Sequence, residues 1–253
     1  VAEPRLLSSL KGKMVVAAAA GEEHSLAAAS DGEMFAWGSG SFGKLGLGDP
    51  TDESTPRPVT AAAGHHVTAV ACGYAHSVAL CANYEVLVWG SGWKGKLGLG
   101  DNQNRATPTP IQMLKRKHVL QVACGSFHTL ALAESGDIFT WGIGERGQLG
   151  HGDEEDRLLP TRVEGLEGVH SVAAGDGHSL AIASDGRAVA DGPGSLLTRA
   201  TPPGCTAVCF RPRSQRRPPQ QPLMQPKMQA SKVPPTRSRS PTTTAPTAAA
   251  SAS

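Results

Sequence analysis

The stretch that decides the fold lies at residues 89–101 and reads WGSGWKGKLGLGD. The same pattern stands 52 residues earlier at 37–49, as WGSGSFGKLGLGD, and 52 residues later at 141–153, as WGIGERGQLGHGD. Self-similarity at a fixed period of about 20–50 residues is the signature of repeat architectures, in which each repeat is one supersecondary unit. The chain is therefore built from repeats of 52 residues.

Further markers keep the same register, because a Gly-x-x-His unit and a proline also recur once per repeat. The residues that the repeats share are Trp37, Trp89 and Trp141; His24, His76, His128 and His178; Asp49, Asp101 and Asp153; and Pro4, Pro56, Pro108 and Pro160. Independent markers that agree on one period exclude coincidence.

Within one period the local pattern predicts four short strands. Residues 67–72, 76–80 and 85–89 alternate in the manner of strands and are separated by Gly73 and by a turn at Asn83. Residues 109–114 predict a fourth strand, which Pro108 and Pro110 place at a sheet edge or a strand start. Four antiparallel strands per repeat of this length are typical of a β-propeller blade, so the predicted fold is all-β, with each Trp anchoring one blade on the next.

The order of parts in the third repeat resembles that of the regulator of chromosome condensation (RCC1) repeat family. It is seen at residues 137–142, 148–153, 160–163 and 172–181, and the resemblance covers residues 2–190. It implies an RCC1-type propeller, which usually has seven blades. This chain holds about three to four four-stranded blades, so the predicted propeller is incomplete. It begins in the middle of a repeat, and Asp191 stands where a further Trp is due.

The net charge of +2 averages two unlike halves. Residues 192–253 carry nine basic and no acidic side chains, which leaves 15 basic and 22 acidic residues before them. We therefore divide the chain into a propeller at 1–190 and a tail at 191–253 that is rich in Pro, Ser, Thr and Ala and is predicted to be disordered. The tail is either a basic arm for nucleic acid or an anionic membrane, with a phosphorylatable Ser240, or a linker or misassigned reading frame.

The sequence predicts no catalytic, cofactor or metal site. The three G-x-G-x-x-G stretches, which begin at Gly38, Gly90 and Gly142, are followed by glycine-rich loops rather than the helix that a dinucleotide site needs. The four repeated histidines occur once per blade, so we expect them to hydrogen-bond turn backbone rather than bind metal. The three aspartates are expected to form turns.

Five cysteines without regular spacing and the lack of a visible secretory signal favour an intracellular protein, in the cytoplasm or nucleus. No apolar run approaches the length of a membrane span.

The favoured function is a regulatory module or scaffold that binds another protein through loops that differ between repeats. The candidate partner-binding residues are Phe42, Trp93, Lys94, Glu145 and Arg146, supported by segments 50–54, 102–106 and 154–158. The family resemblance implies an alternative, guanine-nucleotide exchange on a Ran-like small GTPase. A further alternative is chromatin binding through the tail, and open propeller edges would permit self-association. The Gly-Trp-Arg-His-Thr motif of the ultraviolet photoreceptors in this family is absent.

Overall fold

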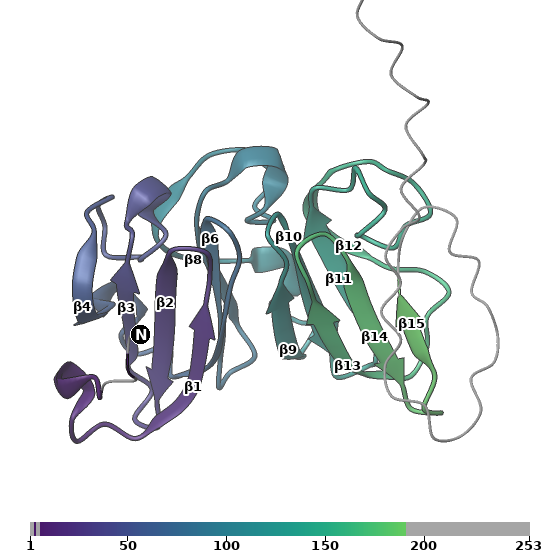
Figure 1. Cartoon of the computed structure of the whole chain (residues 1–253). Coiled ribbons are helices and arrows are strands. Elements are labelled where there is room, and N and C mark those ends of the chain that lie inside the picture. The colour runs from purple at the N-terminus through teal and green to yellow at the C-terminus, as the bar shows by residue number, and fades with distance from the viewer. Residues whose placement is uncertain (1–2, 4–5, 191–253) are drawn as a thin grey trace, which may run out of the picture. The chain divides into compact units, whose positions relative to one another are not determined.

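The computed structural model of the chain describes residue 3 and residues 6–190 (Figure 1). The predictions for the tail at 191–253 and for the first few residues lie outside this part of the chain. Within residues 6–190 the structure is built from strands and short 3₁₀ turns, and no helix there is long and apolar enough to cross a membrane.

Four antiparallel sheets follow one another along the chain, and within each sheet the strands pair in sequence order. The first sheet contains β1 (Val15–Ala20), β2 (His24–Ala29), β3 (Met34–Gly38) and β4 (Glu53–Pro58). The second contains β5 (Val67–Cys72), β6 (His76–Cys81), β7 (Val86–Gly90) and β8 (Arg105–Pro110). The third contains β9 (Val119–Cys124), β10 (His128–Ala133), β11 (Ile138–Gly142) and β12 (Arg157–Arg162). The fourth contains β13 (Val169–Ala174), β14 (Ser179–Ala183) and β15 (Ala188–Ala190). The 3₁₀ turns are η1 (Ser8–Leu10), η2 (Ser41–Gly43), η3 (Thr60–Ala62), η4 (Trp93–Gly95) and η5 (Gln112–Leu114).

The all-β, blade-like architecture is confirmed, and one strand position is corrected. The last strand of the second sheet is β8 at 105–110, not 109–114 as predicted. The Ile111 amide donates to the Val86 carbonyl. The chain then turns into η5, where the Leu114 amide donates to the Ile111 carbonyl at 3.2 Å. Ile111 and Leu114 are both buried, so this apolar pair closes the core between sheets instead of extending the strand.

The core lies between consecutive sheets, because the strands present small and large side chains on opposite faces. From β6, Val78 and Leu80 pack toward the third sheet, whereas Ala79 and Cys81 pack toward the first. The first strands of successive sheets also contact one another: β1 packs on β5, β5 on β9 and β9 on β13. Three apolar clusters result, one for each pair of neighbouring sheets.

The repeated tryptophans fix two of these interfaces. Trp89 and Trp141 are fully buried. The Trp89 indole N–H donates to the Lys44 carbonyl, and that of Trp141 donates to the Lys96 carbonyl, both at 2.9 Å and both across 45 residues of sequence. Trp37 in the first sheet is only half-buried, since no sheet precedes it among the described residues.

Candidate partner-binding face

A relay of side-chain hydrogen bonds ties each sheet to the next. The His24 ring Nε2 lies 2.9 Å from Ser77 Oγ, and this hydroxyl donates to the Lys44 carbonyl at 2.7 Å. Because the hydroxyl proton is committed to the carbonyl, the imidazole N–H is the donor to Ser77. The other ring nitrogen, Nδ1, is buried and has no hydrogen-bond partner in the structure.

The same relay is repeated at the next two interfaces. His76 bonds Thr129 at 3.0 Å, and His128 bonds Ser179 at 2.8 Å. The expectation that these histidines bond the backbone of their own turns was wrong for His24, His76 and His128, because the partner is a hydroxyl on the neighbouring sheet. Burial lowers the pKa of His24 and of His128 to about 4, and that of His76 well below its usual value, so all three rings are neutral.

The glycine of each Gly-x-x-His unit makes room for this ring. A Cβ on Gly73 would lie 2.1 Å from the His76 ring carbon Cε1 and 2.7 Å from the Gly125 carbonyl oxygen of the next sheet. The motif is therefore a packing unit between sheets, with glycine required by close approach rather than by a turn.

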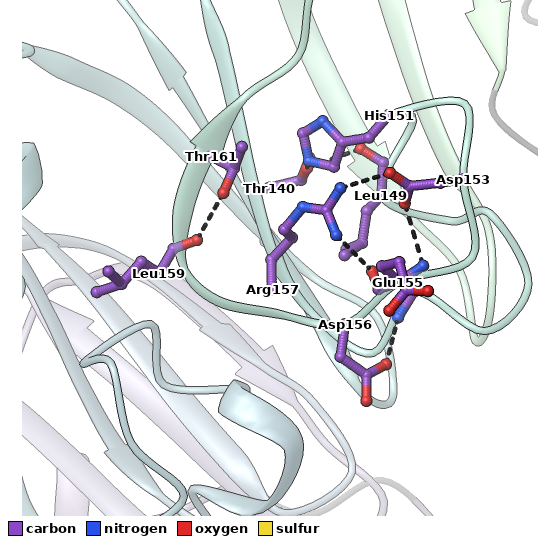
Figure 2. Close-up of polar contacts among 10 residues, drawn as sticks. Thr140, Leu149, His151, Asp153, Glu155, Asp156, Arg157, Leu159 and Thr161 are labelled. Carbon is purple, nitrogen blue, oxygen red and sulfur yellow. Dashed lines mark hydrogen bonds and ion pairs between the residues drawn. The ribbon is translucent and has the colours of Figure 1, made fainter.

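The repeated aspartates shape the long loop that follows the third strand of each complete sheet. In the third sheet, Asp153 Oδ1 accepts the Glu155 amide (3.1 Å) while its Oδ2 accepts Arg157 (2.6 Å), and Asp156 accepts the Gly144 amide (2.9 Å) (Figure 2). Asp49 and Asp101 each accept, through Oδ1, a hydrogen bond of 2.9 Å from the backbone amide two residues later in the chain. These are the bonds of a turn-forming aspartate, and they use the carboxylate oxygens that catalysis would need.

The loops gather at the end of the sheets where β2, β6 and β10 begin, and this end carries an aromatic cluster. Tyr74 and Phe127 lie with ring centroids 5.3 Å apart, and Trp93 meets Phe127 edge-on at 6.3 Å. Trp93 is 53% exposed and Tyr74 43% exposed. Large aromatic side chains that remain exposed in a group mark interaction sites.

Two lysines are packed into this cluster. Lys94 Nζ lies 5.4 Å from the Trp93 ring centroid and forms ion pairs with Glu145 and with Asp156 (3.2 Å). Lys96 Nζ lies 5.5 Å from Trp93 and 5.3 Å from Phe127. Burial lowers the pKa of Lys96 to about 8, and the two ring faces favour its charged form as cation–π partners. We call Tyr74, Trp93, Lys94, Lys96 and Phe127 the aromatic–lysine cluster.

The structure brings together three of the five loop residues predicted from the sequence, Trp93, Lys94 and Glu145. Phe42 is 51% exposed on η2 but is not part of the cluster. Arg146 is also outside the cluster, and its Nη1 forms an ion pair with Asp176 Oδ2 at 3.9 Å. Sequence reasoning missed Tyr74 and Phe127, although a signal was present: both occupy the variable positions of a Gly-x-x-His unit that is otherwise constant.

Comparison with known proteins agrees with the architecture. The family model described as RCC1-like domain matches residues 1–204. The chain is 39% identical over 186 residues to the ultraviolet-B receptor UVR8 of Arabidopsis thaliana, covering 72% of this chain and 42% of the relative. It is 42% identical over 191 residues to the E3 ubiquitin-protein ligase HERC2 of Homo sapiens, covering 72% of this chain but 4% of the relative. The chain thus spans less than half the length of these relatives.

Solved structures give the same result. Prp20p from Saccharomyces cerevisiae superposes with a TM-score of 0.65 at 27% identity, over 74% of this chain and 47% of that protein. Human WBSCR16 superposes with a TM-score of 0.62 at 31% identity, over 69% and 46% respectively. The fold defines the class of the chain, an all-β module of propeller-type blades. The chain belongs to the RCC1-like domain family.

Proposed function

We propose that the chain is a regulatory protein-interaction module whose partner binds at the aromatic–lysine cluster. The observation that supports this is an exposed aromatic surface above a lysine that has no carboxylate partner among the described residues. The partner side chain that fits is an Asp or Glu flanked by apolar residues, which would contact Lys96 and the rings of Trp93 and Tyr74.

A comparison between two repeats supports this choice of partner. Lys44 occupies in the first repeat the position of Lys96 in the second, and its Nζ lies 3.3 Å from Glu23 Oε2. The Lys44 side chain is only 2% exposed, yet the carboxylate that reaches it belongs to a 63% exposed side chain. A buried lysine at this position is therefore accessible to an acid from the surface. In the second repeat Ala75 stands where Glu23 stands in the first, so the acid has to come from another molecule.

The test is selection of peptides on the full chain from a defined library in which Asp or Glu lies beside apolar residues. We expect such peptides to be enriched over sequences in which Lys replaces the acids. Trp93→Ser installs the residue of the first repeat, and Ala75→Glu gives Lys96 an internal carboxylate. Each should weaken the selected peptides at least about 10-fold, the loss of roughly 1.4 kcal/mol expected of an interface anchor.

Phe42→Ser is the matched control, since Phe42 is equally exposed at the same end of the sheets but lies outside the cluster. Binding that survives Trp93→Ser and Ala75→Glu, or that is lost equally in Phe42→Ser, would contradict the proposed site.

Guanine-nucleotide exchange on a Ran-type GTPase is the second candidate. It is favoured by the likeness to Prp20p, whose structure is described together with that protein's binding to Gsp1p and histones. The assay is release of a fluorescent guanine nucleotide from a Ran-type GTPase with the full chain in excess. Acceleration would support exchange, whereas a rate equal to that of the GTPase alone leaves peptide binding as the function.

Chromatin binding through the tail is a separate proposal that rests on the nine basic residues of 192–253. It requires DNA binding that weakens steeply with salt and disappears when residues 193–253 are deleted. Binding that persists in the deleted chain would assign the contact to the acidic propeller portion and reject this proposal.

A further inference from the structure

Three side chains that can ligate a metal meet at the other end of the second sheet, away from the aromatic–lysine cluster. His65 precedes β5, Cys81 ends β6, and Glu85 precedes β7. His65 Nδ1 lies 2.9 Å from Glu85 Oε2, and one ligand atom from each of the three residues lies within 4.8 Å of the other two. We propose that His65, Cys81 and Glu85 bind a divalent transition-metal ion, with Zn²⁺ as the ion that fits best.

The backbone holds the three ligands in place. The Cys81 amide donates to the Glu85 carbonyl at 2.9 Å, and the Tyr84 amide donates back to Cys81 at 2.9 Å, so Cys81 and Glu85 face each other across a closed hairpin turn. The Ala82 amide donates to the His66 carbonyl at 2.9 Å, which fixes the segment that carries His65 beside this turn. The metal would therefore find its ligands on bonded backbone rather than on a free loop.

The neighbouring repeats have the same backbone but different side chains. The bond from Ala82 to His66 recurs as Ser30 to Met14 (2.8 Å) and as Glu134 to His118 (2.9 Å), which shows that the positions are equivalent. The residues at the positions of His65, Cys81 and Glu85 are Lys13, Ala29 and Glu33 in the first repeat and Lys117, Ala133 and Asp137 in the third.

In those repeats the position serves an ordinary surface contact. Lys13 forms an ion pair with Glu33 at 2.7 Å and lies 5.9 Å from the Phe35 ring centroid. Lys117 lies in the same way 5.4 Å from the Phe139 ring centroid. The second repeat replaces this lysine with His65, and it replaces the alanine with a cysteine at the same corner. Of the first three repeats, the second is the one that places an imidazole, a thiol and a carboxylate together at this corner, and this combination supports a metal site.

The chemistry of the three groups selects the ion. Thiolate, imidazole and carboxylate are all Zn²⁺ ligands, and three protein ligands with water in the fourth tetrahedral position form an open zinc site. Burial raises the pKa of the Cys81 thiol to about 12, so binding must displace its proton. As the Zn–S bond forms, Cys81 releases one proton to solvent and no electron is transferred. His65 and Glu85 are 35% and 18% exposed, which gives the ion a path from solvent.

The experiment titrates the reduced, metal-free full chain with Co²⁺, whose thiolate complex has a sulfur-to-metal charge-transfer band, and then displaces it with Zn²⁺. The expected result is one equivalent of Co²⁺ with this band and with tetrahedral visible absorption, and full displacement by Zn²⁺. Cys81→Ala should abolish the band. His65→Lys should weaken binding by more than the roughly 10–100-fold that loss of an outer-shell partner costs.

Both substitutions install residues that the other repeats carry on the same backbone, so the folded state should be kept, and an unchanged melting temperature without metal verifies this. Cys72→Ala is the matched control. It removes a second thiol that packs between sheets, at a position where other repeats carry Ala20 and Ala174. A Cys205→Ala, Cys209→Ala background removes the thiols of the tail. The proposal is overturned if no charge-transfer band forms, or if the band survives Cys81→Ala and disappears with Cys72→Ala or with the tail cysteines.

Discussion

At the scale of the residue, the hydroxyl that follows each repeated histidine decides how two sheets join. Ser77 accepts from His24 of the first sheet and donates to the Lys44 carbonyl, whose second lone pair takes the Trp89 indole N–H. Three buried donors, the His24 ring N–H, the Ser77 hydroxyl and the Trp89 indole N–H, and one backbone carbonyl are thus hydrogen-bonded. Removing the hydroxyl leaves a buried N–H and a buried C=O with incomplete bonding, which is the costly case for hydrogen bonds.

We predict that Ser77→Ala lowers the free energy of unfolding by about 1–3 kcal/mol. Ser25→Ala, at the equivalent position of the first sheet, should change it by less than about 0.5 kcal/mol, because no described sheet lies beyond Ser25 to supply a histidine. Urea unfolding followed by tryptophan fluorescence measures both. Equal effects of the two substitutions would contradict the relay as an energetic link.

The three neutral histidines also predict a pH dependence. In the folded chain the pKa values of His24 and His128 are about 4 and that of His76 lies well below its usual value, whereas all three lie near 6.5 when unfolded, so the unfolded chain binds more protons below about pH 6.5. The free energy of unfolding should therefore fall as pH drops from about 6.5 toward 4, by up to roughly 1.4 kcal/mol per pH unit for each histidine. The aspartates with lowered pKa values, such as Asp101 and Asp153, reduce the free energy of unfolding only below about pH 4, since the ordinary pKa of an aspartate is 3.8.

Urea midpoints measured at a series of pH values give this slope. His128→Gln removes one of the titrating rings and should flatten it by about one proton, at the cost of a less stable chain throughout. A slope that stays the same in His128→Gln would show that this ring is already protonated in the folded state.

At the scale of the element, each sheet is an intermediate layer whose two faces contact different neighbours. In β6, Val78 faces the third sheet and Ala79 faces the first. The small side chain of Ala79 lets the first sheet approach Trp89, which packs on the same face. The exposure of equivalent residues follows from this layering: Trp89 and Trp141 are fully buried, whereas Trp37 at the first sheet is not.

We predict that Trp89→Ala destabilises the chain by about 3–5 kcal/mol, the usual cost of emptying a buried tryptophan site. Trp37→Ala should cost clearly less, because part of that ring already contacts solvent. Chemical unfolding monitored by far-ultraviolet circular dichroism compares them without relying on the fluorophore removed. If Trp37→Ala proved the more damaging, the anchor between sheets would have to be placed elsewhere.

The sequence was sufficient to predict the elements and insufficient to predict which copies of the repeat touch. Periodicity showed that the histidine of the Gly-x-x-His unit recurs, but a repeat gives the same pattern in every copy, so it does not reveal that the histidine of one copy meets a hydroxyl of the next. For the same reason the loop residues Trp93 and Lys94 were predicted, whereas Phe127, which joins them from the third sheet, was not. The position of β8 was misjudged because Pro110 ends the strand and Leu114 belongs to the core.

At the scale of the whole molecule, stability is the sum of sheet-to-sheet interfaces, and these are unequal. The first two interfaces each contain a fully buried tryptophan, Trp89 or Trp141. The third is smaller, has Leu130, Leu132 and Ile138 as its largest members, and contains no aromatic residue among those described.

We therefore predict that the fourth sheet opens first. Amide hydrogens of β14 should exchange faster than those of β6, although both are second strands, because less apolar area is exposed when β14 separates from its neighbour. Hydrogen exchange read by mass spectrometry on peptides from the two strands tests this. Equal protection would mean that the described sheets unfold as one cooperative unit.

The constant spacing of the links between sheets has a consequence for how such a chain can change in evolution. Trp89 reaches Lys44, and Trp141 reaches Lys96, over the same 45 residues. A gene that gains or loses one whole repeat brings equivalent partners together again at the new junction. The histidine link is also kept in a shorter repeat, because His128 meets Ser179 across 51 residues, two fewer than at the first two junctions. We therefore expect duplication or deletion of an entire blade to preserve the links between neighbouring sheets.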